Sequence, residues 1–153
     1  MERVLRGDQA AASRALSLVI NEAPEAALLS REFFAKSGSV QKIGVCGPPG
    51  ADKSTLVGRL ITLYRKRQMK VGVLAVDPSS HVSGGAFLGD RLRIQDHAVD
   101  AGVFIRSVAT RGMVGGLSHT IFGAVHVLEA AGFDKILIET VGTGQDEVEI
   151  SRV

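Results

Sequence analysis

The sequence predicts an α/β fold with a doubly wound, mostly parallel sheet, preceded by a helical extension. From about residue 40 onward, short apolar segments alternate with longer amphipathic ones, as strands alternate with helices in a parallel sheet. The composition is also aliphatic, with 45% hydrophobic residues, 5% aromatic residues and 18 glycines in a chain of 153 residues. Such a composition suits strands that are covered on both faces, and the length suits one domain with a sizeable core.

Residues 1–38 are predicted to form the helical extension. Asp8 can cap a first helix, and Pro24 can open a second one with Glu25 in its first turn. Apolar residues expected to face inward recur in both helices at Ala11, Ala15, Leu18, Val19, Leu28, Leu29 and Phe33. The segment Ser37–Ser39 is then a linker to a domain formed by residues 39–153.

The strands of that domain are predicted from its short apolar segments. They are Lys42–Cys46, Val71–Val76, Val103–Arg106 and Lys135–Glu139. The second is apolar nearly throughout, which favours a central, parallel position. Cys46 ends the first strand, which is expected to be buried, and is therefore expected to be a core residue. Because it is the single cysteine of the sequence, an intrachain disulfide and a cysteine-based metal cluster are excluded.

Helices are predicted between these strands. The helix Lys53–Arg67 is indicated by apolar residues at helical spacing, namely Leu56, Leu60, Ile61 and Leu63. Its basic end, Arg65–Arg67, matches the helix dipole and is interpreted as a solvated terminus. A short helix is predicted at Asp90–Asp96 and a longer one from about Leu117 to Ala131, with Gly132 as its C-cap.

The turn between the first strand and its helix differs at one residue from the phosphate-binding pattern G-x-x-x-x-G-K-[ST], because Asp52 replaces the second glycine. In such a loop, backbone N–H groups and the helix N-terminus face a phosphate chain. Lys53 supplies a point charge, and the Ser54 hydroxyl can bind magnesium. The predicted nucleotide-binding residues are Gly47, Pro48, Pro49, Gly50, Ala51, Asp52, Lys53, Ser54 and Thr55. The carboxylate of Asp52 opposes tight binding, since it adds repulsion against phosphate charges.

Three acids are candidates for the same site. Asp77 and Glu139 end predicted strands, and ligands of open parallel sheets bind at the carboxyl ends of strands. A helix-capping role remains open for Asp77, whereas the glycine-rich Thr140–Gly144 segment after Glu139 favours a functional role. Asp90 follows Gly89 in the first of two glycine-rich segments, residues 78–90 and 140–145. Each segment follows a strand end, so both are predicted to be nucleotide-dependent switch loops.

Charge and hydropathy exclude several classes of function. The net charge of +2 is too small to indicate nucleic-acid binding or an acidic membrane surface. No apolar run of transmembrane length and no signal peptide occurs, so a cytoplasmic protein without membrane association is expected. The four histidines are scattered without a metal-ligand spacing, and surface or packing roles are expected for them. Arg106, Arg111 and His119 can reach phosphates, but nothing in their surroundings requires it.

The motifs together resemble one family, the methylmalonyl-CoA mutase-associated GTPases, also labelled arginine/ornithine transport-system ATPases. The resemblance runs from about residue 3 to 153. It is carried by Gly47–Thr55, Val73–Ser80, Ser83–Gly85, Leu88–Arg91, Phe104–Arg106, Gly115–Gly116, Leu128–Asp134 and Ile138–Gln145. It implies a P-loop NTPase fold and a cytoplasmic G protein that binds GTP or GDP with Mg²⁺. The family hydrolyses GTP slowly and assists an adenosylcobalamin-dependent acyl-CoA mutase by gating cofactor loading and protecting the enzyme.

The resemblance also implies roles for individual residues. Catalytic roles fall to Lys53, Asp77, Asp90 and Glu139, and the metal site to Ser54, Asp77, Asp90 and Glu139. The switches correspond to residues 78–93 and 140–147, including Pro78, Ser79, Ser80, Gly84, Gly85, Thr140, Val141, Gly142, Gly144 and Gln145.

The sequence departs from the family pattern in two respects. Asp52 replaces the loop glycine, and no [NT]-K-x-D element for reading guanine occurs before Val153. We therefore expect the C-terminal part of the G domain to be missing, together with the helices through which full-length members form homodimers. Two alternatives stay open: an interaction module of the same fold with impaired nucleotide binding, and a P-loop ATPase or kinase.

Overall fold

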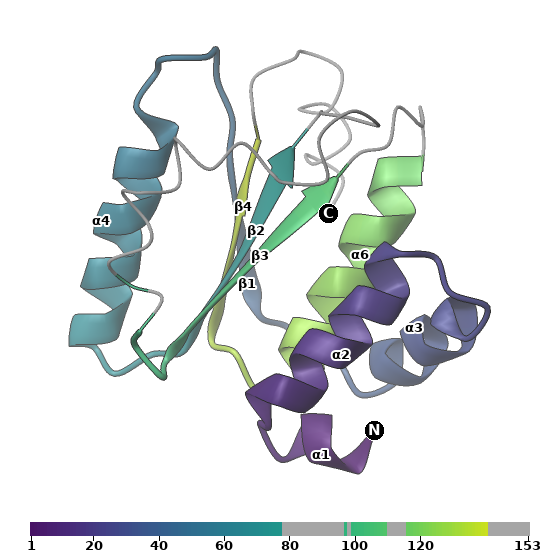
Figure 1. Ribbon diagram of the computed structural model, residues 1–153. Coiled ribbons are helices and arrows are strands. Elements are labelled where there is room, and N and C mark those ends of the chain that lie inside the picture. Colours follow the sequence, from purple (N-terminus) through teal and green to yellow (C-terminus); the bar gives the residue numbers. More distant parts are fainter. Residues whose placement is uncertain (78–96, 98, 110–115, 141–153) are drawn as a thin grey trace.

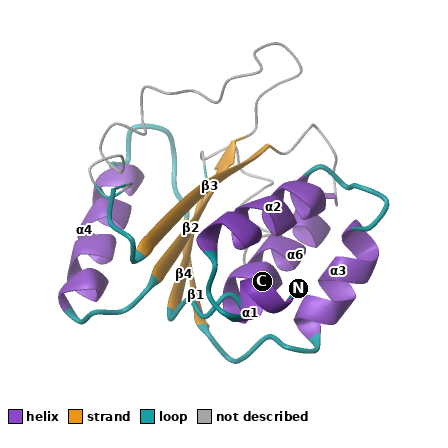
Figure 2. Cartoon of the chain, turned by 60° about the horizontal axis from the view of Figure 1, so that its bottom comes forward, coloured by secondary structure: helices purple, strands orange, loops and turns teal. Residues whose placement is uncertain are grey.

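The structure is a computed structural model, and it describes residues 1–77, 97, 99–109 and 116–140 (Figure 1). A parallel sheet forms the middle layer. Helix α4 (Lys53–Lys66) covers one face, and α6 (Gly116–Ala130) covers the other. The helices of the extension pack onto α6, on the side away from α4 (Figure 2). This arrangement confirms the predicted α/β fold with its helical extension.

Within the described residues, the sheet contains four parallel strands in the order β1-β4-β2-β3. Their bounds are Gln41–Val45 for β1, Val71–Asp77 for β2, Val103–Ala109 for β3 and Lys135–Glu139 for β4. The predicted central position of β2 is confirmed, since it pairs with both β3 and β4. The same order makes β1 an edge strand among the described residues, with Gln41 and Gly44 exposed. The expectation of a buried first strand was therefore wrong.

Alternating side chains of the strands divide the apolar core into two parts. On the α4 face, Leu137 of β4 packs in a cluster with Val57 and Ile61 of α4. On the opposite face, Ile136 and Ile138 join a larger cluster with α6 and the extension. This alternation follows from the period of two residues in a strand, and it buries β4 on both faces.

The extension consists of α1 (Glu2–Leu5), α2 (Gln9–Ile20) and α3 (Ala26–Phe34). The predicted cap is confirmed, because an Asp8 carboxylate oxygen accepts a hydrogen bond from the Ala11 N–H at 2.9 Å. The extension packs closely on α6 at Gly123, where a Cβ atom would lie only 2.6 Å from a methyl carbon of Val19. Glycine at this position lets the helices approach each other.

Several sequence-based expectations need correction at single residues. Leu18 and Leu28 were expected to face inward but are 39% and 62% exposed. On α4, the apolar residues that indicated the helix divide between two sides: Ile61 is buried with Val57 and Gly58, whereas Leu56 and Leu63 are exposed. Cys46 was expected in the core and is exposed, because the edge strand β1 ends before it. The predicted helix Asp90–Asp96 lies outside the described residues.

Candidate functional site

The loop between β1 and α4 has the backbone of a turn that favours glycine. Gly47 and Gly50 have φ angles of 147° and 79°. Asp52 also has a positive φ, with φ 55° and ψ 29°, and it directly precedes the first turn of α4. Left-handed backbone of this kind is strained for most side chains, although aspartate tolerates it better than most. Asp52 thus keeps a conformation that glycine adopts readily, and its exposed side chain does not cap α4.

Lys53 folds its side chain back over this loop. Its ammonium group donates hydrogen bonds to the carbonyl oxygens of Gly47 at 2.7 Å and Pro48 at 2.9 Å. A lysine ammonium is a mobile donor on a long stem, so other oxygen atoms can replace these two acceptors. The charge is therefore held at the mouth of the loop by contacts that an anionic ligand can displace.

Ser54 and Glu139 meet at the carboxyl edge of the sheet. The Ser54 hydroxyl donates a hydrogen bond to a carboxylate oxygen of Glu139 at 2.5 Å, across 85 positions of sequence. Parallel pairing positions Glu139, because it lies opposite Val45, the last residue of β1, in the register of β4. The Thr140 N–H also donates to the Val45 carbonyl at 3.1 Å, which ties the ends of these two strands together.

The other predicted site residues are only partly within the described structure. Asp77 ends β2 at the same edge of the sheet, but its side chain is not among those described. Thr140 is described and buried, with 1% of its surface exposed. The predictions for Pro78, Ser79, Ser80, Gly84, Gly85, Asp90, Val141, Gly142, Gly144 and Gln145 lie outside the described residues. The structure therefore brings together Lys53, Ser54 and Glu139 from the predicted set.

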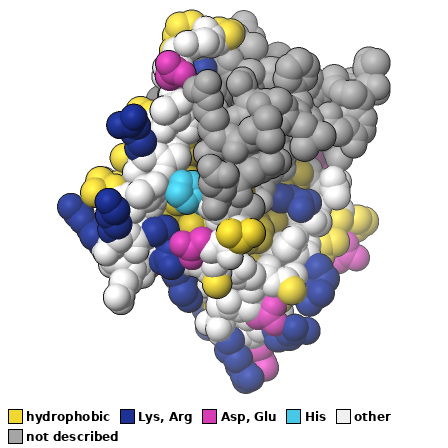
Figure 3. Space-filling model, turned by 60° about the vertical axis from the view of Figure 1, so that its left-hand side comes forward, with side chains coloured by type: hydrophobic (Ala, Val, Ile, Leu, Met, Phe, Trp, Pro, Cys, Tyr) yellow, Lys and Arg dark blue, Asp and Glu magenta, His cyan; other side chains and the backbone are white. Residues whose placement is uncertain are grey.

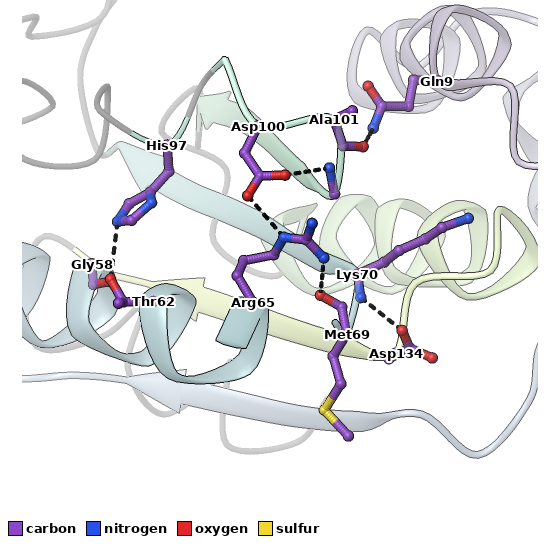
Figure 4. Close-up of polar contacts among 11 residues, drawn as sticks. Gln9, Gly58, Thr62, Arg65, Met69, Lys70, His97, Asp100, Ala101 and Asp134 are labelled. Carbon is purple, nitrogen blue, oxygen red and sulfur yellow. Dashed lines mark hydrogen bonds and ion pairs between the residues drawn. The ribbon is translucent and has the colours of Figure 1, made fainter. Parts of the chain in front are cut away.

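The amino edge of the sheet carries a polar cluster that the sequence-based reasoning missed (Figure 4). Arg65 of α4 donates to the Asp100 carboxylate at 2.9 Å and to the Met69 carbonyl at 2.8 Å. The hydrogen bond from Arg65 is the main cause that lowers the pKa of Asp100, and the same bond raises the pKa of Arg65. Asp100 also accepts from the Gly102 N–H at 2.7 Å. A Cβ atom on Gly102 would collide with the guanidinium group, so this glycine leaves room for Arg65.

A second polar cluster lies where the linker enters β1. The Glu129 side chain of α6 is 1% exposed and forms an ion pair with Lys42 at 3.1 Å. His126 lies 3.3 Å from the same carboxylate, and its ring contacts Phe34 of α3 edge to face. A buried glutamate among these partners joins the extension, α6 and β1. The sequence feature from which this cluster could have been predicted is the i, i+3 spacing of His126 and Glu129, which places both on one helix face.

Arg106 makes a contact that connects two elements of the fold. Its guanidinium group donates to the Ser17 hydroxyl of α2 at 2.7 Å. This contact links β3 to the extension, and it turns the side chain toward α2.

Among the described helices, none combines the length and the apolar character that a bilayer crossing requires.

Comparison with known proteins gives a consistent result. The family model described as "Methylmalonyl Co-A mutase-associated GTPase MeaB" matches residues 12–153. A protein of Pyrococcus abyssi is 49% identical over 150 residues, which cover 98% of this chain and 46% of that protein. GTPase ArgK of Escherichia coli is 38% identical over 157 residues, covering 100% of this chain and 47% of ArgK.

A solved structure extends the likeness to three dimensions. The crystal structure of a protein titled "LAO/AO transport system kinase" matches with a TM-score of 0.77 and 30% identity, over 99% of this chain and 45% of that one. The chain thus spans less than half the length of each of these proteins. With the family model matching most of its residues, the chain belongs to the MeaB family of methylmalonyl-CoA mutase-associated GTPases.

Proposed function

We propose that this chain binds GTP with magnesium at the β1–α4 loop, hydrolyses it slowly, and assists an adenosylcobalamin-dependent acyl-CoA mutase. The observation that carries the proposal is the meeting of Ser54 and Glu139, with Lys53 beside them at the carboxyl edge. Membership of a family of mutase-associated GTPases supports the choice of nucleotide and partner.

The donor set at this edge suits magnesium. Ser54 offers a hydroxyl oxygen and Glu139 a carboxylate oxygen, and magnesium prefers such hard oxygen ligands. Asp77 ends the neighbouring strand β2, and we assign it and Asp90 to the same metal site. Bound magnesium neutralises charge that develops on the transferred phosphoryl group.

The protein's own side chains then have defined roles. The Lys53 ammonium exchanges the carbonyl oxygens of Gly47 and Pro48 for phosphate oxygens. The Ser54 hydroxyl, which donates to Glu139 in this structure, would hold the metal through its oxygen. Glu139 becomes available to orient the attacking water by accepting a hydrogen bond from it. Residues 78–93 and 140–147 act as switches that respond to the terminal phosphate.

A calorimetric titration tests this function. GTP, GDP and ATP are titrated into the protein with and without magnesium, and the same series is run on Lys53→Ala. Binding of guanine nucleotides that needs magnesium is expected, and loss of the lysine should weaken it by about 1.5–3 kcal/mol, or roughly 10- to 100-fold. Lys36→Ala, at an exposed residue in the turn after α3, serves as the control. Equal affinity in Lys53→Ala, or a preference for ATP, would contradict the proposal.

One observation favours a second function, an interaction module with impaired nucleotide binding. Asp52 brings a carboxylate into the loop at the N-terminus of α4, within one residue of Lys53. Undetectable binding of every nucleotide by the unmodified chain, together with retained binding to the mutase, would support this second function.

A further inference from the structure

The outer face of α4 carries leucines where a solvated helix usually carries polar residues. Leu56 is 51% exposed and Leu63 is 45% exposed, and Leu60 between them is half-buried. These three residues are spaced i, i+4 and i+7, so they follow one line along the helix. The buried residues Val57, Gly58 and Ile61 occupy the side that faces the sheet. Leu60 also packs against the cluster between α4 and the sheet, so the line borders the buried face, and Leu56 and Leu63 are its solvent-exposed members.

Basic side chains flank this line, and the helix itself carries no acidic residue. Arg59, Lys66 and Arg67 are exposed, and the sequence has neither Asp nor Glu from Lys53 to Arg67. In the part of the chain that the structure describes, no carboxylate forms an ion pair with any of these three. Figure 3, with the α4 side turned forward, shows dark blue and yellow side chains next to one another along its left margin.

The helix dipole does not account for all of these charges. Cations at the C-terminus of a helix match its dipole, which explains Lys66 and Arg67. Arg59 lies in the middle of α4, outside the last turn where the dipole acts. Arg65, from the same basic run, is already held by Asp100 and the Met69 carbonyl. The basic residues left on the outer face thus have no structural role among the described contacts.

We propose that this outer face, made of Leu56, Arg59, Leu60, Leu63, Lys66 and Arg67, is a docking surface for a protein groove that is apolar with carboxylates on its rim. An amphipathic helix that enters a groove presents anchors at i, i+4 and i+7, which is the spacing of the three leucines. Carboxylates on the rim complement the flanking cations and steer the encounter. Pairing with a second copy through its own α4 is disfavoured, because two basic helices would repel each other.

The partner for the test comes from the proposed function, and the inference rests on that function in this respect. The adenosylcobalamin-dependent acyl-CoA mutase from the same genome is immobilised, and the dissociation constant of the 153-residue protein is measured by surface plasmon resonance. We expect Leu56→Ser/Leu63→Ser to bind at least about tenfold more weakly, since buried interface anchors are worth more than about 1 kcal/mol each. Arg59→Glu/Lys66→Glu should mainly slow association and reduce its dependence on salt.

Matched controls distinguish the loss of this docking surface from a general effect of removing exposed leucines or of destabilising the fold. Leu18→Ser/Leu28→Ser removes two exposed leucines from the extension and should leave mutase binding unchanged. Affinity for GTP and the melting temperature are measured for every variant, and both should equal those of the unmodified protein. The altered leucines and cations are exposed, so their replacement leaves the core intact.

The outcomes distinguish this inference from the proposed function. Mutase binding that is equal in the unmodified protein and both α4 variants overturns the docking surface alone. If the unmodified protein does not bind the mutase, both the proposed partner and this docking surface are overturned. The proposed nucleotide site is tested separately, by the affinity for GTP. In a last experiment, the unmodified protein and the α4 variants are sedimented with phosphatidylserine vesicles. If the unmodified protein binds the vesicles and the α4 variants do not, the face binds membranes and the proposal is overturned.

Discussion

The two edges of the sheet use their polar groups differently. At the amino edge, Arg65, Asp100 and the Gly102 N–H satisfy one another and close the turns between α4, β2 and β3. At the carboxyl edge, Lys53 donates hydrogen bonds to loop carbonyl oxygens, and Ser54 donates one to Glu139. The first set holds the chain in place, whereas the second consists of contacts that a phosphate or a metal ion can take over.

The difference shows how one sheet can combine stability with a responsive site. Strand ends on one side are fixed by short hydrogen bonds to neighbouring backbone, so the register of β2 and β3 does not depend on a ligand. Strand ends on the other side hold charged side chains beside a loop whose backbone includes the left-handed Asp52. Binding sites of parallel sheets lie at this carboxyl edge for the same topological reason.

The largest expected effect concerns the amino edge. Glu129→Ala removes the buried carboxylate that pairs with Lys42, and breaking a buried ion pair costs about 3 kcal/mol. We expect the free energy of unfolding, from urea denaturation, to fall by roughly this amount. Replacement of the exposed Glu25 by Ala is the control and should change it little. A loss below about 1 kcal/mol would mean that the cluster contributes no more than a surface pair.

A smaller effect is expected at the carboxyl edge, from Asp52. A carboxylate about 5 Å from one phosphate charge costs roughly 3 kcal/mol at an effective dielectric near 20, and solvent and Lys53 offset part of it. Asp52→Gly should therefore tighten GTP binding about tenfold, measured by calorimetry. The free energy of unfolding of this variant should stay within about 1 kcal/mol of that of the unmodified protein. Glycine removes the strain of the left-handed backbone, but it also increases the conformational entropy of the unfolded chain.

Asp52→Asn separates charge from shape at this position. Asparagine keeps the size of the side chain and tolerates left-handed backbone equally well, but it carries no charge. Tighter GTP binding by both variants would identify the charge of Asp52 as the cause of weak binding. Tighter GTP binding by the glycine variant alone would identify steric crowding as the cause. Unchanged affinity in both would show that the loop tolerates the aspartate.

The smallest effect is a pH dependence at the amino edge. The hydrogen bond from Arg65 lowers the pKa of Asp100 below its ordinary value of 3.8. A lowered pKa in the folded state stabilises the fold above the unfolded pKa, and this contribution is lost as the pH falls through the folded pKa. Asp100→Asn should thus be less stable than the unmodified protein at pH 7, and the difference should shrink below about pH 4.

Thermal melts between pH 2 and pH 7 provide this measurement. Asp8 also has a lowered pKa, mainly through its hydrogen bond from the Ala11 N–H, and it contributes the same acid dependence to both proteins. The comparison of the two melting curves therefore isolates Asp100. A difference that stays constant across the whole pH range would assign the effect of the variant to lost geometry instead of lost charge.

Much of the fold was predictable because local patterns specify it. The strand Lys135–Glu139 was predicted with its observed bounds, since its apolar run is short and lies between a glycine turn and a polar end. The Asp8 cap was predictable from one residue before an apolar helix. The loop carrying Lys53 and Ser54 was recognisable because Gly47, Lys53 and Ser54 keep the spacing of the pattern, although Asp52 replaces its second glycine.

Single-residue burial was less predictable. Leu56 and Leu63 are spaced i and i+7, as on one helix face, but Val57 and Ile61, spaced i and i+4, also share a face, and it is this second pair that is buried. Sequence periodicity identifies an apolar face without saying which of two apolar faces meets the core. Cys46 was misplaced for a related reason, since the edge position of β1 depends on strand order and not on its own residues.

The sequence by itself determined the α/β class, the family, and the loop that matches the phosphate-binding pattern except at Asp52. These features are local in the chain, and their residue types are required by backbone geometry or by charge. Only the tertiary structure decided that Ser54 meets Glu139, that Arg65 meets Asp100 and that Glu129 is buried beside Lys42. Each of these pairs joins residues at least 35 positions apart. Their contact depends on the parallel register of the strands and on how the helices pack across the sheet, which no local pattern specifies.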